Sequence, residues 1–139
     1  MNAMTVRVFG LIVLSIVSIG MLSPMQLTPP PTITPAEVRA LMERDTMYVL
    51  LDVRTPAEFD GPTGHLSGSL LIPVQDLEQR LAELSPFKQK TIIAICRSGN
   101  RSGYATTLLR TKGFTALNMV GGMVRWLAEE RPVIHTEPR

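Results

Sequence analysis

The chain has 139 residues, of which 45% are hydrophobic and 19% are charged, a balance that excludes a disordered tail and predicts one domain with a buried core. Fourteen Lys and Arg against twelve Asp and Glu leave a net charge of +2. The basic residues are scattered and only 5% of residues are aromatic, which argues against a nucleic-acid-binding protein.

An uncharged apolar segment lies near the amino terminus, from Val8 to Leu22, and Arg7 precedes it. With small residues at Ser18 and Gly20, this layout predicts a secretory signal peptide within residues 1–25, and hence a periplasmic or extracellular protein. The alternative is an uncleaved membrane anchor, because a spanning helix needs about 17 to 25 mostly apolar residues. The prolines that follow predict an extended linker over residues 26–32, and the domain is expected over residues 33–139.

Helices and strands are expected to alternate along the domain. Capping patterns at Thr34 and Thr55, each followed by proline and then by glutamate, mark helix starts. Short apolar runs mark strands, and apolar residues at helical spacing mark amphipathic helices. In chain order the expected elements are a helix from Thr34, a strand over 48–53, a helical turn at 55–58, a strand over 69–73, an amphipathic helix over 74–84, a strand over 91–96, a helix containing Tyr104 to Leu109, a strand over 116–120 and a helix over 123–130.

This alternation predicts a three-layer α/β domain with a mainly parallel central sheet and helices on both faces. Ligands bind such sheets beyond the carboxyl ends of the strands, where helix N-termini point their free amides. Cys96 stands at such an end. Met119, Met123 and Trp126 fit the packing of the last strand and helix better than a binding site.

The most informative segment is the polar loop that begins at Cys96, the single cysteine of the chain. One cysteine excludes an intramolecular disulfide, a multi-thiolate zinc site and a Cys-x-x-Cys redox pair. A helix N-terminus and neighbouring arginines favour the thiolate, which is the nucleophilic form. Gly99 and Gly103 permit positive φ, so that backbone amides can turn inward around the sulfur as an anion cradle. The alternative is an ordinary buried cysteine beside a solvated turn.

In four blocks the sequence resembles the small single-domain rhodanese-like sulfurtransferases. The blocks are LLDVRTPAEF (50–59), GHLSGSLLIP (64–73), TIIAICRSGNRS (91–102) and GGMVRW (121–126). The resemblance implies that Cys96 takes a sulfane sulfur from a small anionic donor such as thiosulfate, becomes a persulfide and passes the sulfur to a thiophilic acceptor. Cyanide would accept it in vitro, and a thiol or a protein in the cell. No metal and no organic cofactor is implied.

The loop residues have expected roles in that chemistry. Arg97 and Arg101 would compensate the negative charge of the donor, and the backbone amides of residues 97–101, including that of Gly99, would hold the persulfide. Side chains of Ser98, Asn100 and Ser102 would add donors, or simply form the turn and cap the next helix.

Residues outside the loop are expected to support it. Asp52 would accept hydrogen bonds from the loop, while Arg54 and Glu58 would pair across the helical turn. His65 is expected to satisfy backbone groups and not to act as a base, and His135 is expected to be solvated.

Two other functions stay open. The domain would alternatively be a persulfide-carrying or protein-docking module, with thiosulfate turnover incidental. Cysteine-dependent phosphatases resemble this loop too, but they place the anion-binding arginine one residue later, at the position that Ser102 occupies here. Because Arg101 comes sooner, we expect a smaller cradle that fits one sulfur better than a phosphoryl group. Contact with a membrane is expected only through the N-terminal segment, if it is not cleaved.

Overall fold

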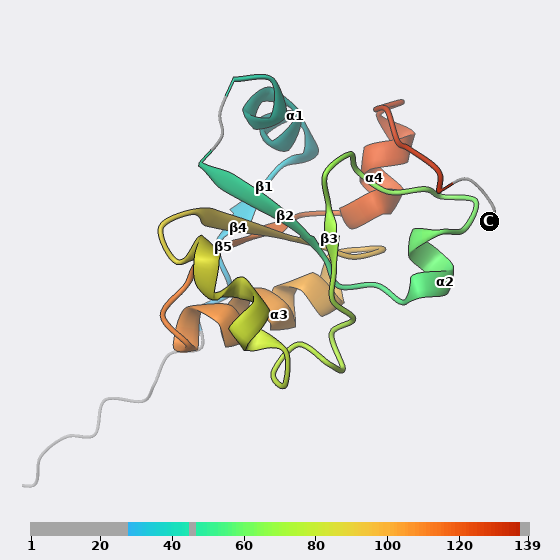
Figure 1. Cartoon of the computed structure of the whole chain (residues 1–139). Helices are drawn as coiled ribbons and strands as arrows, with labels where there is room; N and C mark the ends of the chain where they lie inside the picture. The colour runs from blue at the N-terminus through green and yellow to red at the C-terminus, as the bar shows by residue number, and fades with distance from the viewer. Residues whose placement is uncertain (1–27, 45–46, 137–139) are drawn as a thin grey trace, which may run out of the picture.

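The computed structural model describes residues 28–44 and 47–136 (Figure 1). The predicted signal peptide or anchor over residues 1–25 lies outside the described residues. Within the described part, no helix is long and apolar enough to cross a membrane.

A five-stranded parallel sheet forms the centre of the domain, with strand order β1-β5-β4-β2-β3. Its strands are β1 (Thr32–Ile33), β2 (Tyr48–Asp52), β3 (Leu70–Leu71), β4 (Thr91–Ile95) and β5 (Thr115–Met119). The parallel sheet expected from the sequence is therefore confirmed. Strand β1 begins at Thr32, the last residue of the linker expected over residues 26–32.

Helices cover both faces of the sheet, which gives the three predicted layers. Figure 1 shows α1 (Pro35–Arg44) and α4 (Gly122–Ala128) above the sheet and α3 (Asn100–Thr111) below it. The short helix α2 (Pro56–Phe59) lies at the end of the sheet, next to α4. A capping box at Thr55 and Glu58 starts α2, as the sequence predicts.

The hydrophobic core is divided by the sheet, and β4 contributes to both halves. Ile92, Ala94 and Cys96 belong to the cluster between the sheet and α3, whereas Ile93 and Ile95 belong to the cluster between the sheet and the helices α1 and α4. This alternation follows from the two-residue period of a strand. It buries the strand on both faces and directs the Cys96 side chain toward α3.

One predicted helix is replaced by tighter structure. Residues 74–80 form turns, and Leu81–Phe87 form a 3₁₀ helix (η1) that contains Pro86. Proline lacks an N–H group and its ring clashes with the carbonyl group four residues earlier, so Pro86 disfavours only the last turn of the expected α-helix, from Ala82 onward. The apolar pattern is nevertheless used, because Leu77 and Leu84 are both fully buried.

Candidate active site

The loop that carries Cys96 lies between β4 and α3, at the carboxyl edge of the sheet. Asp52 and Ile95 are partners in the register of β2 and β4, so both strands end at the same edge. Gly99 adopts a φ of 105° as the N-cap of α3, and a Cβ there would lie 3.3 Å from the Gly121 nitrogen. The backbone therefore makes a left-handed turn around the sulfur that favours glycine. Gly103, expected to share this freedom, lies inside α3 with ordinary φ.

The sulfur of Cys96 is surrounded by hydrogen-bond donors. The Gly99 amide donates to Sγ at 3.0 Å, and the Ser102 Oγ lies 3.2 Å from Sγ. Burial raises the pKa of the Cys96 thiol. Hydrogen bonds from the Ser102 hydroxyl and from the amides of Ser102, Gly99 and Ser98 lower it, and together they outweigh burial, so that the pKa falls below its ordinary value. The site thus favours a thiolate that is only 1% exposed.

The two arginines of the loop differ in their surroundings. Arg101 makes a bidentate ion pair with Glu58, with both N–O distances at 2.7 Å. This hydrogen bonding, outweighing burial, lowers the pKa of Glu58 to about 2. Arg97 is exposed and has no ion pair within the described part of the chain. Arg97 is therefore the loop cation that is available to an anionic ligand.

Asp52 and Arg54 form a buried ion pair instead of the contacts expected for them. The Arg54 guanidinium donates to both carboxylate oxygens of Asp52 at 2.7 to 3.0 Å. Its remaining N–H groups donate to Thr63 Oγ1 and to the carbonyl oxygens of Glu58 and Gly64. Asp52 thus accepts from Arg54 and not from the loop, and Arg54 contacts the Glu58 backbone and not its carboxylate. A guanidinium that is 1% exposed needs a buried carboxylate, which explains the exchange of partners.

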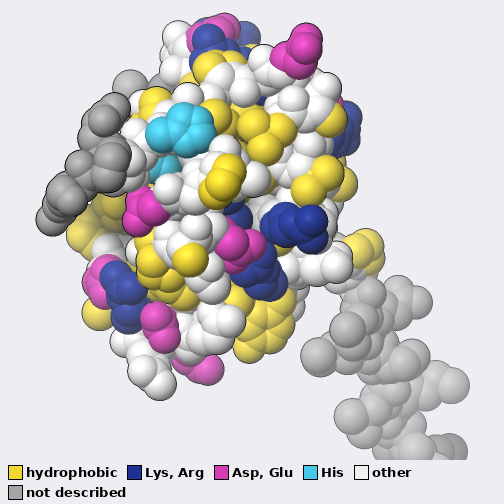
Figure 2. All heavy atoms as spheres, turned by 90° about the vertical axis from the view of Figure 1, so that its right-hand side faces the viewer, with side chains coloured by type: hydrophobic (Ala, Val, Ile, Leu, Met, Phe, Trp, Pro, Cys, Tyr) yellow, Lys and Arg dark blue, Asp and Glu magenta, His cyan; other side chains and the backbone are white. Residues whose placement is uncertain are grey.

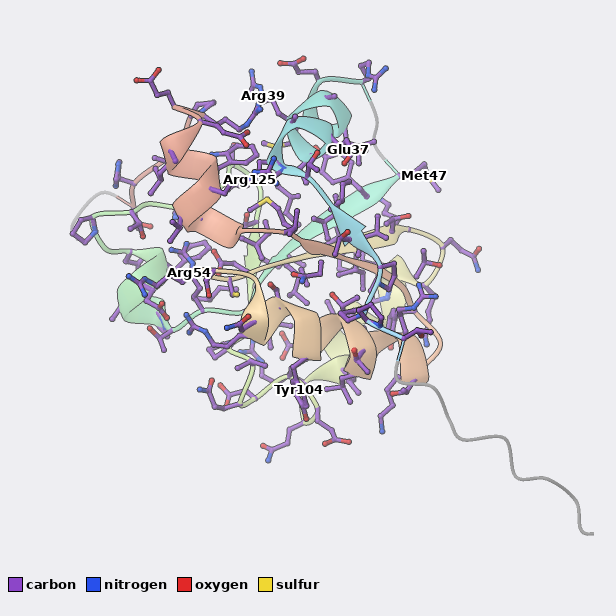
Figure 3. The ribbon with its side chains drawn as sticks, turned by 180° about the vertical axis from the view of Figure 1, so that it is seen from behind. Glu37, Arg39, Met47, Arg54, Tyr104 and Arg125 are labelled. Atoms are coloured by element: carbon purple, nitrogen blue, oxygen red, sulfur yellow. The ribbon has the colours of Figure 1, made fainter. Side chains whose placement is uncertain are left out.

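Arg54 ties the end of the sheet to the segment that holds α2. Figure 3 shows it between α2 and α4. Because its donors reach residues 58, 63 and 64, Arg54 fixes the position of Glu58, which in turn holds Arg101. The supporting residues and the loop are therefore one connected network.

Asn118 on β5 is a site residue that the sequence analysis missed. Its Nδ2 donates to the Gly99 carbonyl oxygen at 3.0 Å, and its Oδ1 lies 2.6 Å from the Ser102 Oγ. Asn118 is 7% exposed. The sequence did contain a signal for it, because Asn118 is an amide side chain inside the otherwise apolar strand 116–120. A buried polar side chain needs hydrogen-bond partners, and the neighbouring loop could supply them.

The side chains of the other candidate residues lie outside this network. Ser98 and Asn100 are exposed, and their side chains make no hydrogen bond within the described chain. His65 stacks on Phe59, and its Nδ1 lies 3.0 Å from the Phe59 carbonyl oxygen, which agrees with a structural role. His135 is exposed. Among the described residues, no group of three His, Cys, Asp or Glu is placed to hold a metal ion.

A pocket of about 380 Å³ opens beside the loop. Helix α4 forms one wall, and it is attached to the loop because the amides of Met123 and Val124 donate to the carbonyl oxygens of Cys96 and Arg97. Figure 2 faces this side and shows basic and acidic side chains next to each other among hydrophobic ones. The lining residues are Arg54, Ala57, Glu58, Pro62, Thr63, Arg97, Met123, Val124 and Leu127.

The fold and this loop define a parallel α/β domain whose single thiol is held by backbone amides at the carboxyl edge of the sheet. The Rhodanese-like domain family matches residues 34–129, and the chain belongs to that family. Thus the family that the four sequence blocks resemble is confirmed.

Several known proteins are similar to the chain. It is 32% identical over 73 residues to the thiosulfate sulfurtransferase PspE of Escherichia coli. This match covers 52% of this chain and 68% of PspE. It is 34% identical over 104 residues to the probable adenylyltransferase/sulfurtransferase MoeZ of Mycobacterium tuberculosis; the match covers 73% of this chain but spans only 26% of MoeZ. Among solved structures, a rhodanese-related protein from Thermoplasma volcanium has a TM-score of 0.67 and 30% identity, covering 75% of this chain and 97% of that one.

Proposed function

We propose that the protein is a sulfurtransferase that moves a sulfane sulfur from thiosulfate or a similar donor, through a persulfide on Cys96, to a thiophilic acceptor. One observation carries this proposal: the sulfur of Cys96 accepts the Gly99 amide at 3.0 Å inside a loop whose donors lower the thiol pKa. A buried structural cysteine does not need such donors. Family membership and the names of relatives such as PspE support the same reaction.

In the first step, the Cys96 thiolate attacks the outer sulfur of thiosulfate. A new S–S bond forms, the original S–S bond breaks, and sulfite leaves with the electron pair. The free guanidinium of Arg97 is the group that would compensate the charge of the donor and of sulfite. In the second step, an acceptor nucleophile attacks the outer sulfur of the persulfide and the Cys96 thiolate leaves. The cycle needs no oxidant and no cofactor.

The state of Arg101 favours sulfur transfer over phosphoryl transfer. A phosphatase uses the arginine of its loop to bind the oxygens of a tetrahedral anion. Here both terminal nitrogens of Arg101 contact Glu58 at 2.7 Å. The loop therefore presents amides around one sulfur and does not present a free arginine fork.

A persulfide-carrying or docking module is the second candidate, and the pocket beside the loop favours it. Its wall contains Val124, which is 52% exposed, together with Leu127 and Ala57. Apolar side chains next to a reactive group suit an organic thiol or a protein acceptor better than cyanide. In that case thiosulfate turnover would be slow and transfer from Cys96 to a protein thiol fast.

We also propose where in the cell the protein is located. The apolar segment from Val8 to Leu22 supports export to the periplasm or the cell exterior, or anchoring to a membrane. Cell fractionation, with the N-terminal sequence of the mature protein, distinguishes these two outcomes. Recovery of the intact chain in the soluble cytosolic fraction would contradict both.

The test of sulfur transfer is thiocyanate production from thiosulfate and cyanide by the full chain, beside Cys96→Ser. We expect turnover only with Cys96, and a resting protein heavier by one sulfur atom on Cys96. No turnover and no sulfur adduct from a folded protein would contradict the enzyme. An adduct without turnover would support the carrier.

A further inference from the structure

Asn118 contacts the catalytic loop with both ends of its amide. Because Nδ2 donates to the Gly99 carbonyl oxygen at 3.0 Å, the orientation of the amide is determined. Its Oδ1 therefore faces the Ser102 Oγ, at 2.6 Å. An oxygen in this position accepts a hydrogen bond and cannot donate one.

The Ser102 hydroxyl has a single proton and two possible acceptors. Asn118 Oδ1 lies 2.6 Å away, and Cys96 Sγ lies 3.2 Å away. Ser102 is fully buried, so water does not reach its side chain. The proton points to only one of the two acceptors at a time, and the charge on the sulfur decides which one is stronger.

We propose that Asn118 is a positioning residue that holds the Ser102 proton whenever Cys96 Sγ is uncharged and yields it to the sulfur when the thiolate forms. This inference rests on the proposed function in taking Cys96 as the nucleophile. In the thiol, S–H donates to Ser102 Oγ and Ser102 donates to Asn118. After the thiol proton leaves to solvent, the hydroxyl rotates toward the negative sulfur. In the persulfide the charge lies on the outer sulfur, and the hydroxyl returns to Asn118.

Competition from Asn118 weakens the hydrogen bond that stabilises the thiolate. Removing the competing oxygen is therefore expected to lower the pKa of Cys96, and removing the hydroxyl is expected to raise it. No charge is altered by either change. The charged groups on the elements around the loop include Arg97, Arg101, Glu58, Asp52, Arg54, Arg110 of α3 and the α4 pair Arg125 and Glu129.

The test is a double-mutant cycle of Asn118→Leu and Ser102→Ala in the full chain. The rate of alkylation by iodoacetamide is followed against pH, and every adduct reports on Cys96 because the chain has one cysteine. We expect Asn118→Leu to lower the titration midpoint by about one unit, the size of one competing hydrogen bond. In the Ser102→Ala background we expect Asn118→Leu to cause no further shift in the titration midpoint of Cys96.

Two results would overturn the proposal. An equal shift in both backgrounds would mean that Asn118 acts only through the Gly99 carbonyl, and no shift in either would mean that it does not compete. If Asn118→Leu does not fold, Asn118→Asp keeps the acceptor and is expected to raise the midpoint more with Ser102 present than without it. An equal rise would contradict the proposal.

Alkylation needs no sulfur donor. Failure of the thiocyanate assay with the expected titration shifts would therefore refute the proposed sulfur transfer alone. A normal thiocyanate assay without those shifts would refute the role of Asn118 alone.

Discussion

The carboxylate of Glu58 and the guanidinium of Arg101 are joined by two 2.7 Å hydrogen bonds across 43 residues of sequence. The pair connects α2 to the first turn of α3, directly beside the loop of Cys96. It assigns different tasks to two arginines that look equivalent in the sequence. Arg101 holds the loop in place, and Arg97 is available to ligands.

Arg97→Gln and Arg101→Gln form a matched pair that tests this division. We expect Arg97→Gln to raise the KM for thiosulfate roughly tenfold, the value of one charge-assisted hydrogen bond, without changing the free energy of unfolding. Arg101→Gln is expected to destabilise the fold by up to about 1 kcal/mol. Steady-state kinetics and urea denaturation measure the two effects. A larger rise in KM for Arg101→Gln than for Arg97→Gln would show that substrate binds Arg101.

The same ion pair predicts a pH dependence of stability. Glu58 has a pKa of about 2 in the fold, lowered from 4.5, so its contribution is complete above pH 4.5 and is lost as the pH falls toward 2. Both side chains are about 30% exposed, and screening by water limits the contribution at neutral pH to about 1 kcal/mol. We expect the stability difference between the native chain and Glu58→Gln to decrease over that acid range.

Thermal unfolding of both chains at several pH values measures this difference. Other carboxylates titrate in the same range, but they are common to both chains and cancel in the comparison. A difference that stays constant down to pH 2 would contradict the assignment of the lowered pKa to this pair.

Asp52→Asn is expected to be strongly destabilising. It leaves the Arg54 guanidinium buried without its carboxylate, and loss of one partner of a buried pair costs about 3 to 5 kcal/mol of unfolding free energy. The control is Glu78→Gln, which removes an exposed pair with Lys112 and costs less than about 1 kcal/mol. Urea denaturation compares the two. Similar losses in both variants would mean that Asp52 does not compensate a buried charge.

Gly122→Ala is expected to impair both the fold and the reaction. At a φ of 55°, a Cβ would contact the Cys96 carbonyl oxygen and lie 2.6 Å from the Arg97 carbonyl carbon. We expect a loss of at least about 2 kcal/mol together with slower alkylation of Cys96. Gly68→Ala is the control, because its φ is 79° but no atom lies within 4 Å. It should cost about 1 kcal/mol and leave alkylation unchanged.

Local patterns in the sequence were sufficient for the parallel sheet, for the capped helix α2 and for the place of Cys96 at a strand end. Each depends on residues close together in the chain, such as the continuous apolar run of β4 or the capping box at Thr55. The helix expected over residues 74–84 was wrong for a similarly local reason. Apolar spacing indicates which residues are buried, but it does not distinguish an α-helix from turns followed by a 3₁₀ helix.

The sequence by itself determined that Cys96 follows a buried strand at the carboxyl edge of the sheet and predicted it as the nucleophile, because strand ends and loop composition are short-range patterns. Only the tertiary structure decided the partners of the polar side chains. Glu58 pairs with Arg101 and not with Arg54, and Asn118 reaches Ser102 from another strand. Such contacts join residues far apart in the chain, and burial makes every charge and amide find a partner in space, whatever its neighbours in sequence.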